Sequence, residues 1–405
     1  ALGIDSTDDD NYKITIQYAN TTQISGGASE SGGKAGSEIV DNVTIEAPNI
    51  YAGVGLANNI VSKSFSMSHA KLIVFSKEIA EKGVKDMIET LVRSEEIRPD
   101  VFIAVANTTA NDYLTSVNPE MEVNPAQYYQ LIYQKNQLVG IPDGQLREFF
   151  TGLYTDNYDS IFPVAGVIEG SGGNSQNEGS EGSSESLDSF ESKSSNEKDE
   201  NEKEKDAEKN TSKYEYDIKN YVGGETAIEK KNKAEAIGAA VFEKDKMVGE
   251  LGEVETEICK MLKGDYTYSY LTYYNNDTPD IPITVKTTQQ KKPKYKIDTD
   301  KKTVDIELYI ESDLYSLPSD YNVENKIEDF ERDVANYTSS ACTEFINNFT
   351  KKYNSDILKL NEKVKYKFLT NNQYNWFKKN VGWSKYKFSV CTNFKVRRTG
   401  LIVRK

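Results

Sequence analysis

The sequence predicts an α+β protein of several domains, in which mixed or mainly antiparallel sheets each pack against helices. Three observations support this fold class. Several segments alternate apolar and polar residues, which is typical of strands with one face in a core. Two short apolar segments enclose a helical pattern, and a later segment has the spacing of one long amphipathic helix. The 405 residues exceed what one hydrophobic core usually supports, so two or three domains are expected.

The first region has clear strand and helix patterns. Residues 12–18 alternate apolar and polar side chains, which predicts a half-buried strand. Residues 72–75 and 101–105 are apolar, which predicts strands buried on both faces. Between them, residues 77–93 have helical spacing that is interrupted at Gly83. This order predicts a βαβ-like unit whose two strands are parallel.

Two further helices are expected to close this region. Residues 125–136 place Tyr128, Leu131 and Ile132 on one helical face, and residues 144–153 carry a second apolar face.

Two segments lack the apolar residues that a core requires. Residues 25–37 are rich in glycine and serine and predict a long mobile loop. Residues 170–212 carry almost no apolar side chains beyond Leu187 and Phe190. Because so little surface can be buried there, the cost of ordering the chain is not offset and disorder is predicted.

The remaining elements alternate between strands and helices. Residues 236–248 predict a β-hairpin that turns at residues 244–246, and residues 254–262 predict a short amphipathic helix. Residues 323–353 predict one long amphipathic helix that covers a sheet. Alternating patterns predict strands at residues 266–272, 303–311 and 386–396. The expected domains are residues 1–168, a disordered acidic insertion at 169–213, a middle α/β domain at 214–278 and a C-terminal α+β domain at 279–405.

Charge is unevenly distributed along the chain. The net charge is −15, yet residues 350–405 contain 15 Lys or Arg against two acidic residues, Asp356 and Glu362. Aromatic residues are interleaved with these lysines, so the region could engage anionic phospholipid head groups or an acidic partner surface. The alternative is that the lysines solvate element faces while the aromatic residues fill the core. Nucleic acid is not expected as a partner, because the rest of the chain is strongly acidic.

Catalytic, metal and cofactor motifs are not evident. The single histidine, His69, excludes a site that needs two imidazoles, and Gly53 and Gly55 lack the rest of a dinucleotide-binding fingerprint. A Ser-His-Asp arrangement with Ser66 or Ser68 has no nucleophile elbow to support it. Glu253 and Glu255 could serve glycoside hydrolysis, but the favoured interpretation places them with Glu257 on the solvated face of a helix. No catalytic residue, cofactor or metal is therefore expected.

Histidine and cysteine positions favour structural roles. His69 precedes an apolar strand, where a lone histidine usually bonds to the backbone, although an interface role stays open. The three cysteines have no CxxC spacing, so neither a disulfide framework nor a zinc site is predicted. Cys259 and Cys342 lie in helical patterns and are expected to be buried. Cys391 lies on the polar face of a strand pattern and is expected to be exposed.

Three motifs in order carry a resemblance to a known family. Residues 68–75 read SHAKLIVF, residues 238–249 read GAAVFEKDKMVG, and residues 397–402 read RRTGLI. Together they resemble the C-subunit, or Ger(x)C, family of spore germinant receptors. The resemblance covers nearly the whole chain, and residues 169–213 look like an insertion into the family pattern.

The resemblance implies a role and a location. Members of this family are non-enzymatic lipoproteins on the outer face of the spore inner membrane, beside two integral-membrane partner subunits. The assembled receptor commits the dormant spore to germinate in response to small germinants. Members of the family carry a cleaved signal and a lipid-modified cysteine a short way upstream of the segment that matches residues 2–5, so the resemblance implies such an anchor. Neither a signal peptide nor a run of about 18 apolar residues is recognised in the 405 residues.

The candidate interface combines the first motif with the basic region. Arg397 and Arg398 could instead form a local ion pair with the long helix. Whether this chain binds germinant itself stays open, and an extracytoplasmic solute-binding module and a cell-wall hydrolase are the alternative functions. The candidate interface residues are Ser68, His69, Lys71, Lys378, Lys379, Lys385, Lys387, Arg397 and Arg398.

Overall fold

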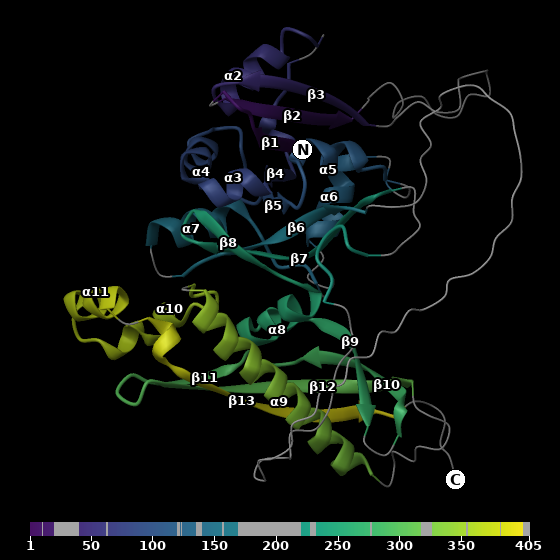
Figure 1. Ribbon diagram of the computed structural model, residues 1–405, viewed down its shortest axis with the longest axis vertical. Coiled ribbons are helices and arrows are strands. Elements are labelled where there is room, and N and C mark those ends of the chain that lie inside the picture. The colour runs from purple at the N-terminus through teal and green to yellow at the C-terminus, as the bar shows by residue number, and fades with distance from the viewer. Residues whose placement is uncertain are drawn as a thin grey trace, which may run out of the picture. The chain divides into compact units, whose positions relative to one another are not determined.

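Two mixed sheets organise the part of the chain that the structure, a computed structural model, describes (Figure 1). The described residues are 1–9, 11–19, 40–61, 64–119, 122, 124–134, 140–155, 158–168, 220–226, 232–275, 278–316, 326–353, 355–380 and 382–399. The predicted loop at residues 25–37 and the predicted disorder at residues 170–212 lie outside them. The α+β fold class, with each sheet packed against helices, is confirmed.

The first sheet has eight strands in the order β3-β2-β1-β4-β5-β6-β7-β8. Its central pairs β1–β4, β4–β5 and β5–β6 are parallel, and the outer pairs are antiparallel. The strands are β1 (Leu2–Ser6), β2 (Tyr12–Ala19), β3 (Val40–Ala47), β4 (Leu72–Ser76), β5 (Phe102–Ala106), β6 (Ile161–Val167), β7 (Ala234–Glu243) and β8 (Lys246–Leu251). The predicted parallel βαβ-like unit is therefore present as β4, α3, α4 and β5.

Helices cover both faces of this sheet, because successive side chains of a strand point to opposite faces. Ile73 and Phe75 of β4 join one core cluster with α2, α3, α4 and α7, while Leu72 and Val74 join another with α5 and α6. Figure 1 shows α3 and α4 on one side of the strands and α5 and α6 on the other. The helices are η1 (Met67–His69), α2 (Ile50–Ala57), α3 (Lys77–Lys82), α4 (Lys85–Val92), α5 (Ala110–Ser116), α6 (Pro125–Gln134) and α7 (Leu146–Thr155).

Two expectations for this region are wrong in detail. Strand β2 is buried on both faces, because Thr15 and Gln17 lie under α5 and α6. Gln17 donates to the carbonyl of Leu114 at 2.5 Å and accepts from the hydroxyl of Tyr129 at 2.5 Å, so its polar atoms are satisfied there. Helix α6 buries Tyr128 and Tyr129 but leaves Leu131 exposed. The helix is fixed against the sheet by tyrosine hydroxyls that form hydrogen bonds within the core. An aliphatic face does not have this role.

The second sheet has five strands and one long helix. Its order is β11-β12-β10-β9, and β13 pairs in parallel with β12. Strand β12 alternates buried and more exposed residues along most of its length, as predicted. The elements are α8 (Glu253–Lys263), β9 (Tyr268–Asn275), β10 (Thr278–Gln289), β11 (Lys294–Asp298), β12 (Thr303–Ser316), α9 (Ile327–Lys352), α10 (Leu360–Val364), η2 (Lys365–Lys367), α11 (Asn371–Asn380), η3 (Trp383–Lys385) and β13 (Lys387–Arg398).

Helix α9 bonds directly to the backbone of β13. Asn347 accepts from the N–H of Phe388 at 3.1 Å and donates to its carbonyl at 3.0 Å, as a neighbouring strand would. Thr343 accepts from the N–H of Val390 at 3.0 Å, and Ser339 accepts from that of Thr392 at 2.9 Å. The helix thereby satisfies backbone groups that an open sheet edge would expose.

The two sheets share one hydrophobic cluster. Ile161, Val241 and Leu251 of the first sheet pack in the same cluster as residues of α9 and β12. Strands β7 and β8, which follow the insertion in sequence, belong to the first sheet. The predicted boundaries of the domains stay a prediction.

Candidate functional site

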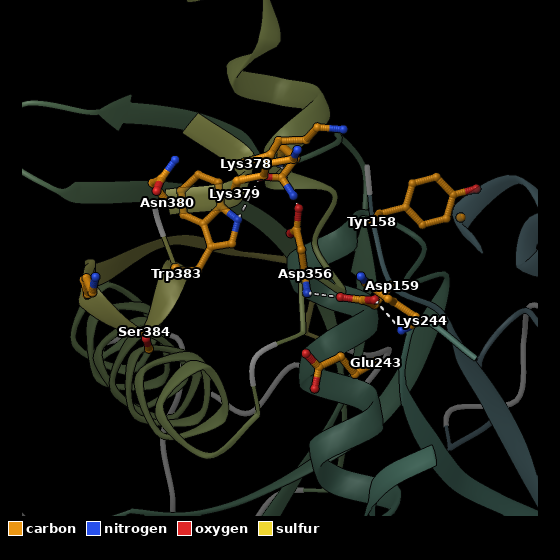
Figure 2. A pocket seen from close by; sticks show the side chains of 14 residues that line it. Tyr158, Asp159, Glu243, Lys244, Asp356, Lys378, Lys379, Asn380, Trp383 and Ser384 are labelled. Atoms are coloured by element: carbon orange, nitrogen blue, oxygen red, sulfur yellow. Dashed lines mark hydrogen bonds between the residues drawn. The ribbon is translucent and has the colours of Figure 1, made fainter. Parts of the chain in front are cut away.

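A cavity of about 600 Å³ lies beside the segment that follows α9. Three separate parts of the chain line it. The lining residues are Gly152, Tyr158, Asp159, Glu243, Lys244, Asp356, Asn361, Lys378, Lys379, Asn380, Gly382, Trp383, Ser384 and Lys385. Figure 2 shows Trp383, Ser384 and Asn380 on one side of the hollow and Tyr158, Asp159 and Glu243 on the other. The cavity therefore joins elements that are far apart in sequence.

Asp159 connects two walls of the cavity. It lies just before β6, and its Oδ1 accepts from the backbone N–H of Lys244 at 2.9 Å. Its Oδ2 accepts from the backbone N–H of Asp356 at 2.8 Å, across 197 residues of sequence. One carboxylate thus holds the β7–β8 turn and the segment after α9 in register (Figure 2).

Asp356 is buried and organises the start of α10. Its two carboxylate oxygens accept from the backbone N–H groups of Leu360 and Asn361, each at 2.8 Å. Burial raises the pKa of Asp356 to about 7; the two N–H donors and Lys363 oppose the rise, and the charge of Asp159 adds to it. Asp356 therefore titrates near neutral pH.

Trp383 forms the aromatic wall. Its indole Nε1 donates to Asn361 Oδ1 at 3.2 Å, and its ring lies 5.9 Å from Phe377 and 4.8 Å from Tyr386. These three aromatic residues are buried, so for them the interpretation as core residues is correct. Trp376 is different, because its side chain is exposed.

Lysines form the rim of the cavity. Lys379 and Lys385 are exposed, and no ion pair or hydrogen bond to a described residue involves their ammonium groups. Lys378 is half-buried, donates to the carbonyl of Thr155 at 3.4 Å and lies 5.1 Å from the centre of the Tyr374 ring. The structure thus brings three predicted interface residues to one cavity. A small molecule with an anionic group could be held at this rim, opposite the acidic wall.

The other basic candidates lie outside the cavity lining. Lys387 and Arg398 are exposed on β13. Arg397 pairs with Glu311 of β12, so the suggested ion pair with the long helix is wrong for this residue. Lys395 makes that contact instead, with Glu331 of α9 at 2.5 Å.

The first motif lies at a different, smaller cavity of about 240 Å³. Ser66 caps η1 by accepting from the N–H of Ser68 at 3.4 Å, and the two hydroxyl oxygens are 2.9 Å apart. His69 is exposed at the end of η1, and within the described residues no hydrogen bond of its imidazole is present. Lys71 is half-buried just before β4, and its carbonyl accepts from Phe102 at 3.1 Å. This geometry lends no support to a Ser-His-Asp triad.

The acidic residues of α8 are structural. Glu255 accepts from the N–H of Gly252 at 3.1 Å and from Asn220 Nδ2 at 3.0 Å, which caps the helix. The expectation that Glu257 faces solvent is wrong, because it is packed beside Tyr266 and its burial raises its pKa to about 7. Cys259 and Cys342 are buried and Cys391 is exposed, as predicted. Among the described residues, no group of three or more His, Cys, Asp or Glu could hold a metal ion.

Sequence reasoning missed Asp159, Tyr158 and Asn361 as parts of this site. They come from separate segments, and their meeting depends on tertiary structure. One signal was present, since Asp356 is one of only two acidic residues in the basic region after residue 350. An isolated carboxylate in such a region is a candidate for a buried, partnered position.

The chain matches two families in succession. Residues 1–167 match the family described as "Spore germination protein N-terminal domain", and residues 237–400 match the family described as "Spore germination B3/ GerAC like, C-terminal". The chain belongs to the Ger(x)C family. It is thus a spore germination protein of this family.

Individual relatives agree with this Ger(x)C assignment. Spore germination protein KC of Bacillus subtilis (strain 168) is 28% identical over 145 residues, which are 33% of this chain and 35% of that protein. The aligned stretch therefore spans about a third of the curated relative. The crystal structure of the GerBC protein matches with a TM-score of 0.53 and 15% identity, covering 98% of this chain and 96% of that one. This likeness shows a shared Ger(x)C fold.

The Ger(x)C assignment implies a spore-associated location. Within the described residues, none of the helices has the length and apolar character that crossing a bilayer requires.

Proposed function

We propose that this chain is the non-catalytic C subunit of a spore germinant receptor. It is tethered by a lipid on an upstream cysteine to the outer face of the spore inner membrane. There it contacts two membrane-embedded subunits and is needed for their response to nutrient germinants. Its mechanism is coupling across interfaces and not bond chemistry.

The succession of the two germination families along the chain carries this proposal. The GerBC likeness over nearly the whole length of both chains supports it, because it shows that both matched regions belong to one Ger(x)C fold. Glu255, one of the two carboxylates that a hydrolase would need, is engaged in capping helix α8.

Germination of spores that lack this chain tests the proposal. Such spores should fail to respond to one class of germinant while still germinating through other receptors. Wild-type protein should restore the response. A variant that lacks the anchor cysteine should restore it poorly. Normal germination of the deletion spores with every germinant that the parent strain uses would contradict the proposal.

A second candidate function is recognition of a small solute at the cavity. The observation that favours it is that Lys379 and Lys385, whose ammonium groups have no ion pair or hydrogen bond to a described residue, lie at a cavity of about 600 Å³ that acidic side chains also line. A ligand that binds only the folded state raises the midpoint of thermal unfolding.

Thermal unfolding with individual amino acids tests this second function. A rise in midpoint that Lys379→Ala and Lys385→Ala abolish would support it, and Lys387→Ala provides a matched control outside the cavity. Unchanged midpoints with all amino acids would count against solute recognition by this chain.

A further inference from the structure

One short segment exposes large apolar side chains that the core does not use. Leu369 is 94% exposed, Tyr366 79% and Trp376 65%. Leu369 and Tyr366 are the two most exposed large apolar side chains among the described residues. They lie in the stretch from η2 to α11. Large apolar side chains that are this exposed and this close together in sequence indicate an interaction surface.

Aromatic packing holds this stretch together. The ring of Phe368 lies 5.9 Å from Tyr374 and 4.9 Å from Phe377, so the turn before α11 packs beside that helix. Tyr374 and Phe377 are the buried residues of α11. Trp376 therefore projects from the opposite side of α11, on the face that also carries Lys379 three residues later.

The same stretch is positively charged. No acidic residue follows Glu362 in the chain. Lys365 and Lys379 are exposed beside the apolar residues, and Lys365 lies 5.8 Å from the centre of the Tyr374 ring. We name Lys365, Tyr366, Leu369, Trp376 and Lys379 the α11 patch. In Figure 1, α11 lies beside α10 near the C-terminal end of α9.

We propose that the α11 patch binds the surface of an anionic lipid bilayer. Tryptophan and tyrosine favour the level of the lipid head groups, and lysines are attracted to anionic lipids. A protein interface would be expected to use arginine and to be depleted of lysine. Every basic residue from 351 to 387 is a lysine. The composition of the stretch therefore favours a membrane over a protein partner.

The patch would be a second attachment to the membrane. A single acyl chain binds a bilayer only weakly and reversibly, and a basic patch adds a second contribution. This use of the patch rests on the proposed lipid anchor. Binding by the patch itself does not rest on that anchor, so it can be measured with the 405 residues alone.

Tryptophan fluorescence provides the test, because the chain has only two tryptophans. Trp383 is buried, so its emission should not move, whereas Trp376 should shift to shorter wavelength when it enters the head-group region. Vesicles of phosphatidylcholine mixed with phosphatidylglycerol should cause the shift at low ionic strength. Pure phosphatidylcholine should cause little shift, and added salt should reverse binding.

Variants separate the contributions to binding. Trp376→Phe should remove the fluorescence shift while vesicle co-sedimentation persists. Leu369→Ser combined with Trp376→Ser should abolish co-sedimentation. Lys365→Gln and Lys379→Gln should each weaken binding about fivefold, the change expected when one lysine leaves an anionic surface. Ile60→Ser, which removes an exposed apolar residue from another part of the chain, should bind as wild type does.

Two outcomes would overturn the proposal. One is an unchanged spectrum and no co-sedimentation with anionic vesicles. The other is binding that persists in the Leu369→Ser, Trp376→Ser variant, provided that circular dichroism shows it folded. If anionic vesicles do not bind and Trp376→Ser weakens association with the membrane subunits, the patch is a protein interface. In either case the receptor-subunit function is judged separately, by germination and co-purification.

Discussion

Two acidic side chains, Asp356 and Glu257, lie where burial disfavours their charged form and so raises their pKa. Asp356 is hydrogen-bonded at both oxygens and still has a raised pKa, which shows that burial outweighs its donors. Glu257 has a raised pKa for the same leading reason. Both groups hold a proton more tightly in the folded chain than in the unfolded chain.

The first prediction concerns pH. Because the folded pKa of Asp356 is about 7 and its ordinary value is 3.8, its contribution to stability is fully present below about pH 4 and is lost as pH rises through 7. Asp356→Asn should reduce this slope by up to about 1.4 kcal/mol per pH unit. Urea unfolding from pH 5 to 8 measures it. An equal slope in the wild type and in Asp356→Asn would contradict the assignment.

At the level of elements, the contact between α9 and β13 is unusual because helix side chains replace a strand. Asn347 binds both backbone groups of Phe388. A second contact of α9 is with the first sheet. Gly249 of β8 packs directly against the ring of Tyr353 at the end of α9.

The second prediction concerns the edge of β13. Asn347→Ala should lower the free energy of unfolding by about 1–3 kcal/mol, because it leaves the N–H of Phe388 without its acceptor. Asn348→Ala is the matched control, since Asn348 is exposed on the next position of the same helix. Chemical denaturation measures both variants. Equal free energies of unfolding in the two variants would show that the contact of Asn347 with β13 does not stabilise the fold.

The third prediction concerns Gly249. A methyl group there would collide with the Tyr353 side chain, so Gly249→Ala should lower the free energy of unfolding by about 1–3 kcal/mol. Gly55→Ala in α2 should be neutral or stabilising by up to about 1 kcal/mol, because nothing lies within 4 Å of the added atom. Thermal unfolding of both variants checks the contrast, and it would be refuted by a loss in Gly55→Ala as large as that in Gly249→Ala.

Elements with strong local patterns could be predicted from the sequence. The apolar runs of β4 and β5, the alternation of β12 and the spacing of α9 all correspond to observed elements. Burial of Thr15 and Gln17 could not be predicted, because the groups that satisfy Gln17 lie about 100 residues away. The cavity could not be predicted for the same reason, since Asp159 and Asp356 meet only in the tertiary structure.

At the scale of the whole molecule, the family assignment and the surface features point to an interaction protein. The basic region divides into three parts with different roles. The aromatic residues around Trp383 fill the core, Lys395 and Arg397 form ion pairs at the surface, and Lys365, Lys379 and Lys385 are exposed.

The fourth prediction concerns the end of β13. Arg397→Glu with Arg398→Glu should leave the fold intact by circular dichroism, because a solvent-exposed ion pair such as that of Arg397 with Glu311 contributes little to stability. The same variant should weaken assembly with the membrane subunits. Unchanged assembly would confine these arginines to a structural role.

Co-purification tests the central claim most directly. Full-length, lipid-anchored protein should be isolated from detergent-solubilised spore inner membrane, together with a sample whose anchor cysteine is replaced. The account predicts that two integral-membrane subunits elute with the anchored protein, in constant ratio, and that the unanchored sample recovers less of them. If the protein elutes alone from membranes that contain these subunits, it is not a stable receptor subunit.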